Sequence, residues 1–168
     1  NVDVTNMYRV ATGTIEVEKE LLGTNTGETF TFELLPYSAT ISGSEYNFDI
    51  PMPGGQTYAK LVKATSYGSK PYDEVSFYNF TPPTVTITPT SGSSGTASFG
   101  KITFYLDEIY QTASEGYTTY DKATYKYLVR EKAGIMEGMQ YDDTAYLVTF
   151  ILKADSSNPG KVNASKTI

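Results

Sequence analysis

Two charged side chains, Lys19 and Glu131, occupy positions at which the sequence pattern predicts apolar residues. Residues 14–22 alternate between polar and apolar types, which is the period of a half-buried β-strand, and Lys19 falls on the apolar side. Its neighbours on that side are Ile15, Val17 and Leu21. Residues 124–131 alternate in the same way, and the neighbours of Glu131 on its side are Tyr125, Tyr127 and Val129. Both charges are therefore predicted to face apolar surroundings.

A buried Lys and a buried Glu have chemistry that their exposed forms lack. Burial lowers the pKa of a Lys amine and raises that of a Glu carboxyl group, because water no longer solvates the charged forms. A neutral amine beside a protonated carboxyl group is what amide exchange onto an Asn side chain requires. Two alternatives involve no chemistry: Lys19 reaches water at the sheet edge while Glu131 ends its strand in solvent, or the two form a buried ion pair.

Composition excludes most other reactions. The chain has no His and no Cys, so it lacks a Ser-His-Asp or Cys-His system, a His- or Cys-ligated metal and a disulfide. Its 13 Lys and Arg against 19 Asp and Glu give a net charge of -6, which disfavours nucleic acid and anionic membranes as partners. The acidic pairs at 107–108 and 142–143 lack the spacing of a calcium loop and are interpreted as solvated turns. We expect no metal and no cofactor.

The elements that position Lys19 and Glu131 are predicted to be β-strands, because 15 Tyr and 8 Phe accompany abundant Thr and Val. The predicted strands are 14–22, 28–35, 45–50, 74–80, 85–88, 98–106, 124–131, 144–152 and 162–168, with a connector at 107–121.

Three features of this strand pattern have further consequences. The strands 14–22 and 28–35 flank a turn and are interpreted as a hairpin-like pair, the second ending before Pro36. Residues 144–152 are apolar on both sides, which is typical of a central strand covered on both faces. The chain contains no internal repeat, so residues 1–168 are predicted to form a single domain.

Four blocks of sequence resemble, in order, the Gram-positive, streptococcal-type pilin isopeptide-linkage domains of T-antigen-like backbone and minor pilins. They are I-E-V-E-K at 15–19, T-F-T-F at 29–32, Y-K-Y-L-V-R-E at 125–131 and Y-D-D-T-A-Y-L-V at 141–148. The resemblance implies an all-β, immunoglobulin-like β-sandwich that is mostly antiparallel. It also implies that Lys19 attacks an Asn carboxamide on the last strand, releasing ammonia, while Glu131 moves the proton and polarises the amide.

The acceptor Asn of this family lies in an F-x-N element on the final strand, and the last predicted strand of this chain, 162–168, contains no match to it. We expect the acceptor beyond Ile168, so that the domain lacks its final strand here. Asn163 is a second candidate, and a strand donated by another molecule is a third. Lys166 resembles the Lys that a sortase joins to the next subunit in some members.

The resemblance implies a structural subunit or stalk domain of a sortase-assembled surface pilus or adhesin, with no turnover of an external substrate. The expected location is extracellular, at the cell surface or anchored to the cell wall. The expected partners are other pilin subunits, joined through a sortase, and a host surface ligand is a further candidate. No apolar run approaches the ~20 residues of a membrane span, so no membrane insertion is expected.

Two other functions remain open from the sequence. An adhesive module could bind a host ligand or glycan through its Tyr-rich strands or through the Ser/Gly loop at 91–95. A glycosidase would need a second catalytic acid beside Glu131, and the pattern singles out none.

Overall fold

The protein is built from antiparallel β-strands. The computed structural model describes residues 10–24, 26–41, 44–46, 50–55, 57–58, 81–90, 92–105, 122–154 and 162–168. Within these ranges the elements are β1 (Val10–Glu20), β2 (Phe30–Ile41), β3 (Ser44–Tyr46), β4 (Ile50–Pro51), the 3₁₀ turn η1 (Pro53–Gly55), β5 (Thr57–Tyr58), β6 (Thr84–Ile87), β7 (Ser94–Tyr105), β8 (Lys122–Lys132), β9 (Ala145–Ala154) and β10 (Val162–Thr167). All the strand pairs among them are antiparallel.

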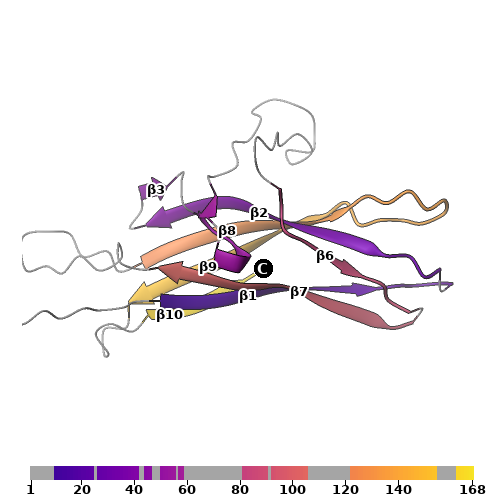
Figure 1. Ribbon diagram of the computed structural model, residues 1–168, viewed down its shortest axis with the longest axis horizontal. Coiled ribbons are helices and arrows are strands. Elements are labelled where there is room, and N and C mark those ends of the chain that lie inside the picture. Colours follow the sequence, from indigo (N-terminus) through magenta and orange to yellow (C-terminus); the bar gives the residue numbers. More distant parts are fainter. Residues whose placement is uncertain are drawn as a thin grey trace, which may run out of the picture.

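The strands form two main sheets that face each other (Figure 1). One sheet consists of β1 and β7, and the other has the order β10-β9-β8-β2-β3, with β6 also paired to β2. Strands β4 and β5 form a short ladder of their own. Because side chains from both main sheets join one buried apolar cluster, the predicted all-β, mostly antiparallel sandwich is confirmed.

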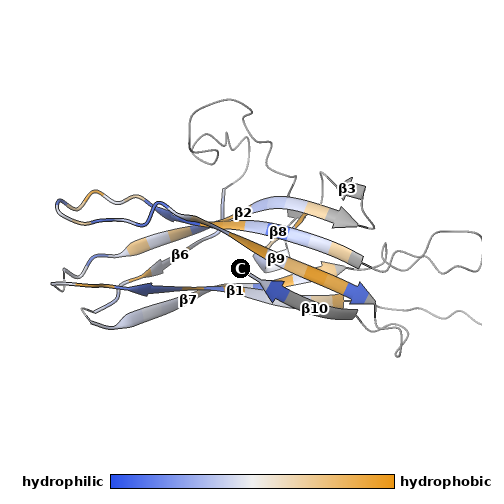
Figure 2. Ribbon diagram, turned by 180° about the vertical axis from the view of Figure 1, so that it is seen from behind, coloured by the Kyte–Doolittle hydropathy of each residue, from blue (hydrophilic) through white to orange (hydrophobic). Residues whose placement is uncertain are grey.

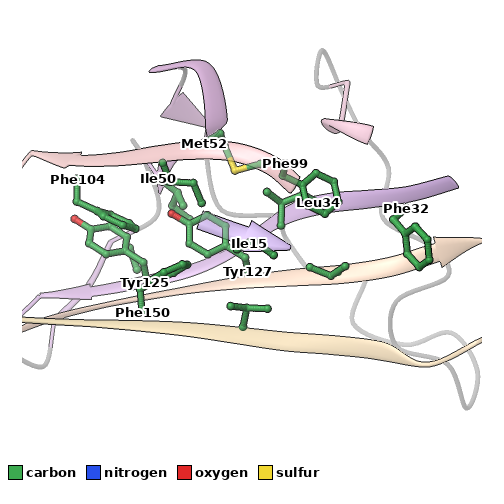
Figure 3. Packing of buried hydrophobic residues seen from close by; sticks show 14 of the residues in the cluster. Ile15, Phe32, Leu34, Ile50, Met52, Phe99, Phe104, Tyr125, Tyr127 and Phe150 are labelled. Carbon is green, nitrogen blue, oxygen red and sulfur yellow. The ribbon is translucent and has the colours of Figure 1, made fainter. Parts of the chain in front are cut away.

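Aromatic rings fill much of the space between the two sheets (Figure 3). The ring of Phe104 in β7 lies 4.9 Å from that of Tyr125 in β8 and 5.4 Å from that of Phe150 in β9, measured between centroids. Fully burying a large apolar side chain contributes about 1.5–3 kcal/mol. The hydroxyl of Tyr127 is also buried, and it donates a hydrogen bond to the carbonyl oxygen of Pro51 at 2.6 Å, which ties β8 to β4.

The predicted hairpin of 14–22 with 28–35 is wrong. Strand β1 pairs with β7 and strand β2 pairs with β8, β6 and β3, so residues 21–29 connect the two sheets. A short polar connection between two amphipathic strands suits a hairpin and a sheet-to-sheet crossing equally well, and the distant partner strand decides between them.

Strand β2 also continues through Pro36, where the sequence predicted an end. Pro36 lies opposite Tyr127, and the register with β8 shifts between Pro36 and Ser38. A proline cannot donate to the ladder and is tolerated where regular pairing is interrupted. The irregularity therefore lets one strand extend from Phe30 to Ile41.

Strand β9 is central in its sheet but is not covered on both faces. It pairs with β8 on one side and β10 on the other, and Val148, Phe150 and Leu152 are buried against the core. In contrast, Leu147 is 37% exposed. Figure 2 shows the apolar stretch of β9 and the hydrophilic tip of β10. The outward-facing Leu147 therefore lies on a partly exposed face, and the apolar run did not indicate a second covering layer there.

The remaining strand predictions have mixed outcomes. Strands β6, β8 and β10 match the predicted 85–88, 124–131 and 162–168 closely, and β7 begins four residues before the predicted 98. The predicted strand 45–50 corresponds to β3 and β4 at its two ends. The predicted strand 74–80 and the connector 107–121 lie outside the described residues.

Candidate functional site

Lys19 and Glu131 meet across the gap between the two sheets. The alternation in β1 turns Lys19 toward the core, and the alternation in β8 turns Glu131 toward it from the opposite sheet. The distance from Lys19 Nζ to Glu131 Oε2 is 2.8 Å, and the two side chains are 16% and 1% exposed. The structure therefore brings together the two residues that the strand pattern singled out.

Aromatic side chains surround this ion pair. The Lys19 ammonium group lies 4.5 Å from the centre of the Phe30 ring, within the range of a cation–π contact. Phe32 lies opposite Glu131 in the β2–β8 ladder and is itself buried. These rings exclude water from one side of the pair, which strengthens its electrostatic interaction.

One oxygen of Glu131 has no hydrogen-bond partner among the described residues. Oε2 accepts from Lys19, whereas Oε1 is buried and unsatisfied. Leaving a buried polar atom unpaired costs about 1–3 kcal/mol, and more for a charged group. An unsatisfied carboxylate oxygen beside an amine is therefore a position at which a further hydrogen-bond donor would be stabilised.

A groove of about 290 Å³ leads to the ion pair from the direction of β10. Lys19 and Glu131 line it together with Tyr146, Asp142 and Ile168. Ile168 directly follows β10, is 79% exposed, and lies about midway along the sandwich, where Figure 1 marks the C-terminal end of the chain. The groove therefore lies in the direction in which β10 points.

A second cavity of about 480 Å³ lies on the other side of Lys19. Its walls come from the β1–β2 connection, including Leu22, and from the β8–β9 connection, including Met139 and Tyr141. These two connections project at the same end of the sandwich (Figure 1). Lys19 and Asp142 line both cavities, so the two cavities share part of their walls.

Asp142 and Tyr146 form a hydrogen-bonded pair at the groove. Asp142 Oδ1 accepts from the backbone N–H of Thr144 at 2.9 Å, and Oδ2 accepts from the Tyr146 hydroxyl at 2.8 Å. Hydrogen bonds from Thr144 are the largest cause of the lowered pKa of Asp142, and the Tyr146 hydroxyl and the charge of Lys19 add to them. The bond to Asp142 is likewise the main reason that the pKa of Tyr146 is raised.

Sequence reasoning missed the place of both residues at the site. Asp142 was interpreted as part of a solvated turn, and Tyr146 served only as part of a block that resembles the pilin family. The available signal was the period of 144–152, which puts Tyr146 on the same side as Val148 and therefore toward Glu131.

The other predicted site residues lie elsewhere on β10. The backbone of Asn163 pairs with Lys153 of β9, five positions before Ile168, or about 16 Å along the strand. Lys166 is exposed, and its Nζ donates to the carbonyl oxygen of Thr14 at 3.3 Å. The structure therefore does not bring Asn163 or Lys166 to the Lys19–Glu131 pair.

In the part of the chain that the structure describes, no group of three or more Asp or Glu side chains is arranged to hold a metal ion. The same residues include no helix with the length and apolar character needed to cross a membrane.

Comparison with known families gives one match, which spans residues 15–168. The matching family is FctA, described as a Spy0128-like isopeptide-containing domain, and it confirms the resemblance to Gram-positive pilin isopeptide domains. Comparisons with curated proteins and with solved structures gave no match. The family match covers nearly the whole chain, from the middle of β1 to the end of β10. The chain therefore belongs to the FctA family of Spy0128-like isopeptide-containing pilin domains.

Proposed function

We propose that this domain is a structural subunit or stalk domain of a sortase-assembled surface pilus or adhesin, stabilised by an isopeptide bond that Lys19 forms with an Asn side chain of the same chain. The observation that supports this proposal is the 2.8 Å contact between Lys19 Nζ and Glu131 Oε2, beside the unsatisfied Oε1. The amine is the nucleophile, and Glu131 is the assisting acid. The reaction occurs once on the chain itself, so the domain is not a turnover enzyme.

The proposed reaction conserves protons and charge when Glu131 carries protons from Lys19 to the leaving nitrogen. Glu131 takes one proton from the Lys19 ammonium group, and the neutral Nζ attacks the carboxamide carbon of the Asn. The protonated Glu131 passes this proton to the amide nitrogen as the carbon–nitrogen bond breaks, and then carries a second proton from Nζ to the departing ammonia. Two of the three Nζ protons leave with that nitrogen as ammonium, and Glu131 ends as a carboxylate. The Oε1 atom supplies the hydrogen-bonding position for the incoming amide N–H group.

We place the acceptor on a continuation of β10 past Ile168. In the β9–β10 ladder Thr167 faces Thr149, so each further residue of β10 would face a residue one earlier in β9. The fourth position past Ile168 would then face Thr144. Glu131 also aligns with Thr144, because Arg130 faces Ala145 in the β8–β9 ladder. An Asn at that position would enter the groove beside Lys19 and Glu131.

The same geometry favours this position over Asn163 as the acceptor. Asn163 lies at the far end of β10, opposite Lys153, whereas the mouth of the groove is at Ile168. We keep Lys166 as the candidate for linkage to a neighbouring subunit, because its side chain is exposed. In this proposal the domain is extracellular and linked to the cell wall, and its partners are other pilin subunits joined by a sortase.

Intact mass of a chain that continues past Ile168 tests the cross-link. The wild-type chain is expected to lack the mass of one ammonia, and Lys19→Ala and Glu131→Ala are expected to have full mass. Lys166→Ala is the matched control, since it removes an exposed Lys and should leave the ammonia loss unchanged. Asn163→Ala should also cross-link, and full mass in that variant alone would make Asn163 the acceptor. Full mass in the wild-type chain would overturn the proposal.

A further inference from the structure

A second carboxylate lies near the Lys19 amine. Asp142 lines both cavities that open onto Lys19, and the positive charge of Lys19 is among the causes of its lowered pKa, after the hydrogen bonds from Thr144. A Lys ammonium group has three donors, and Glu131 Oε2 accepts one of them. Asp142 is therefore a potential competing partner for the same amine.

A direct ion pair between Lys19 and Asp142 would hinder the proposed reaction in two ways. A nearby negative charge stabilises the ammonium form of Lys, whereas attack requires the neutral amine. The pair would also draw Nζ away from Glu131, the group that must receive its proton. Small displacements of a reacting atom are costly, because attack depends on close and aligned contact.

The structure holds Asp142 by both of its oxygens. The N–H of Thr144 fixes Oδ1 within the connection before β9, and the Tyr146 hydroxyl fixes Oδ2 from β9 itself. Tyr146 lies opposite Val129 in the β8–β9 ladder, and this pairing fixes the backbone from which its side chain projects. The side chain of Thr144 contributes a further hydrogen bond to Asp142. A Tyr-to-Phe change at position 146 removes the Oδ2 contact and leaves those of Thr144 in place.

We propose that Tyr146 is a positioning residue for the cross-linking reaction: its hydroxyl holds Asp142 away from Lys19 and leaves Glu131 as the partner of the amine. This inference rests on the proposed function. It assigns Tyr146 no contact with the acceptor and no proton transfer. Its effect is transmitted entirely through Asp142. A second substitution at Asp142 should therefore cancel the effect of removing the hydroxyl.

The test uses a chain that continues past Ile168 and that is isolated unfolded in denaturant before it has reacted. The rate of ammonia loss is then followed by intact mass after the denaturant is diluted. Tyr146→Phe should react more slowly by roughly two- to fivefold, the range that corresponds to one partly exposed ion pair. Adding Asp142→Asn to Tyr146→Phe should restore the wild-type rate, because the competing charge is gone. Asn can still accept from the Thr144 N–H, so Asp142→Asn alone should not slow the reaction.

Tyr141→Phe is the matched control for loss of a neighbouring hydroxyl. The Tyr141 hydroxyl donates to Glu28 and accepts from the Met136 N–H, so any effect of its removal should persist when Asp142→Asn is added. A wild-type rate in Tyr146→Phe would overturn the inference. So would a slow rate that Asp142→Asn does not restore, because the hydroxyl would then act by another route.

A second measurement separates this inference from the proposed function. In the chain of residues 1–168, trace labelling with acetic anhydride reports the nucleophilicity of Lys19 without any acceptor. Lys19 should be labelled more slowly in Tyr146→Phe than in wild type, and Asp142→Asn should reverse the change. If the longer wild-type chain kept its ammonia while this labelling pattern held, the proposed function would fail and the role of Tyr146 would stand. Equal labelling in wild type and Tyr146→Phe would count against Tyr146 alone.

Discussion

The Lys19–Glu131 pair combines a nearly inaccessible carboxylate with a partly accessible amine. Removing one partner of such a pair is costly because it leaves a buried charge uncompensated, whereas replacing both by apolar groups is often neutral. The pair therefore has a consequence for stability that does not depend on any reaction.

In the chain of residues 1–168, Lys19→Met should lower the free energy of unfolding by about 3 kcal/mol, because Glu131 would lose its counter-ion. The double variant Lys19→Met with Glu131→Leu should recover most of that loss. Urea denaturation provides the measurement. Lys153→Met, at an exposed position of β9, is the control and should change stability by less than about 0.5 kcal/mol. A double variant no more stable than Lys19→Met would contradict this account.

At the scale of single elements, strand β8 lies between two other strands and also carries two buried polar side chains. It pairs with β2 on one edge and β9 on the other, and it carries Glu131 at one end and the buried Tyr127 near its middle. Burial is the main reason that the pKa of Tyr127 lies above its ordinary value, with a smaller contribution from Tyr125. The folded protein therefore holds the Tyr127 proton more tightly than the unfolded chain does.

This pKa shift predicts a loss of stability at high pH. Because the pKa is raised in the folded state, its contribution is fully present below about pH 10, the unfolded value, and decreases as the pH rises above it. Tyr127→Phe should lower stability at neutral pH by about 1–2 kcal/mol, since Pro51 loses its hydrogen bond. It should also reduce the decline above pH 10, as measured by urea denaturation across pH. An identical decline in both proteins would contradict the assignment.

The strands themselves, and the inward direction of Lys19 and Glu131, could be predicted from sequence because the signal is local. A period of two over eight residues already determines which side chains share a face. Pairing partners could not be predicted, because β1 finds β7 rather than the adjacent β2. Two further features could not be predicted, because they depend on how separate segments pack: the exposure of each face of β9 and the hydrogen bond from Tyr146 to Asp142. The local pattern therefore identified the ion pair but not the residues that surround it.

At the scale of the whole molecule, the proposed bond would join the two sheets covalently, since Lys19 belongs to the β1–β7 sheet and β10 to the other. Such a link restricts the unfolded chain much as a disulfide does. The protein has no Cys, so this bond would supply the staple that its composition otherwise lacks.

Cross-linking should raise the free energy of unfolding on the order of 2 to 5 kcal/mol, by analogy with a disulfide closing a long loop. The comparison requires a chain that continues past Ile168 and a variant with the acceptor Asn replaced by Ala. That variant keeps the Lys19–Glu131 ion pair and loses only the bond. Thermal and urea unfolding of the two proteins provide the measurement. Equal stability, with the ammonia loss confirmed in the wild type, would show that the bond does not stabilise the fold.

The separation of Lys19 and Glu131 by 112 positions also bears on folding kinetics. Contacts between such distant positions form slowly, because a long loop must close before the contact contributes any stability. Lys19 and Glu131 belong to different sheets, so their contact requires that the two sheets have docked. Bond formation would therefore be the last event in the folding of each molecule, and misfolded chains would stay unlinked. Intact mass would therefore distinguish molecules that have reached the native fold from molecules that have not.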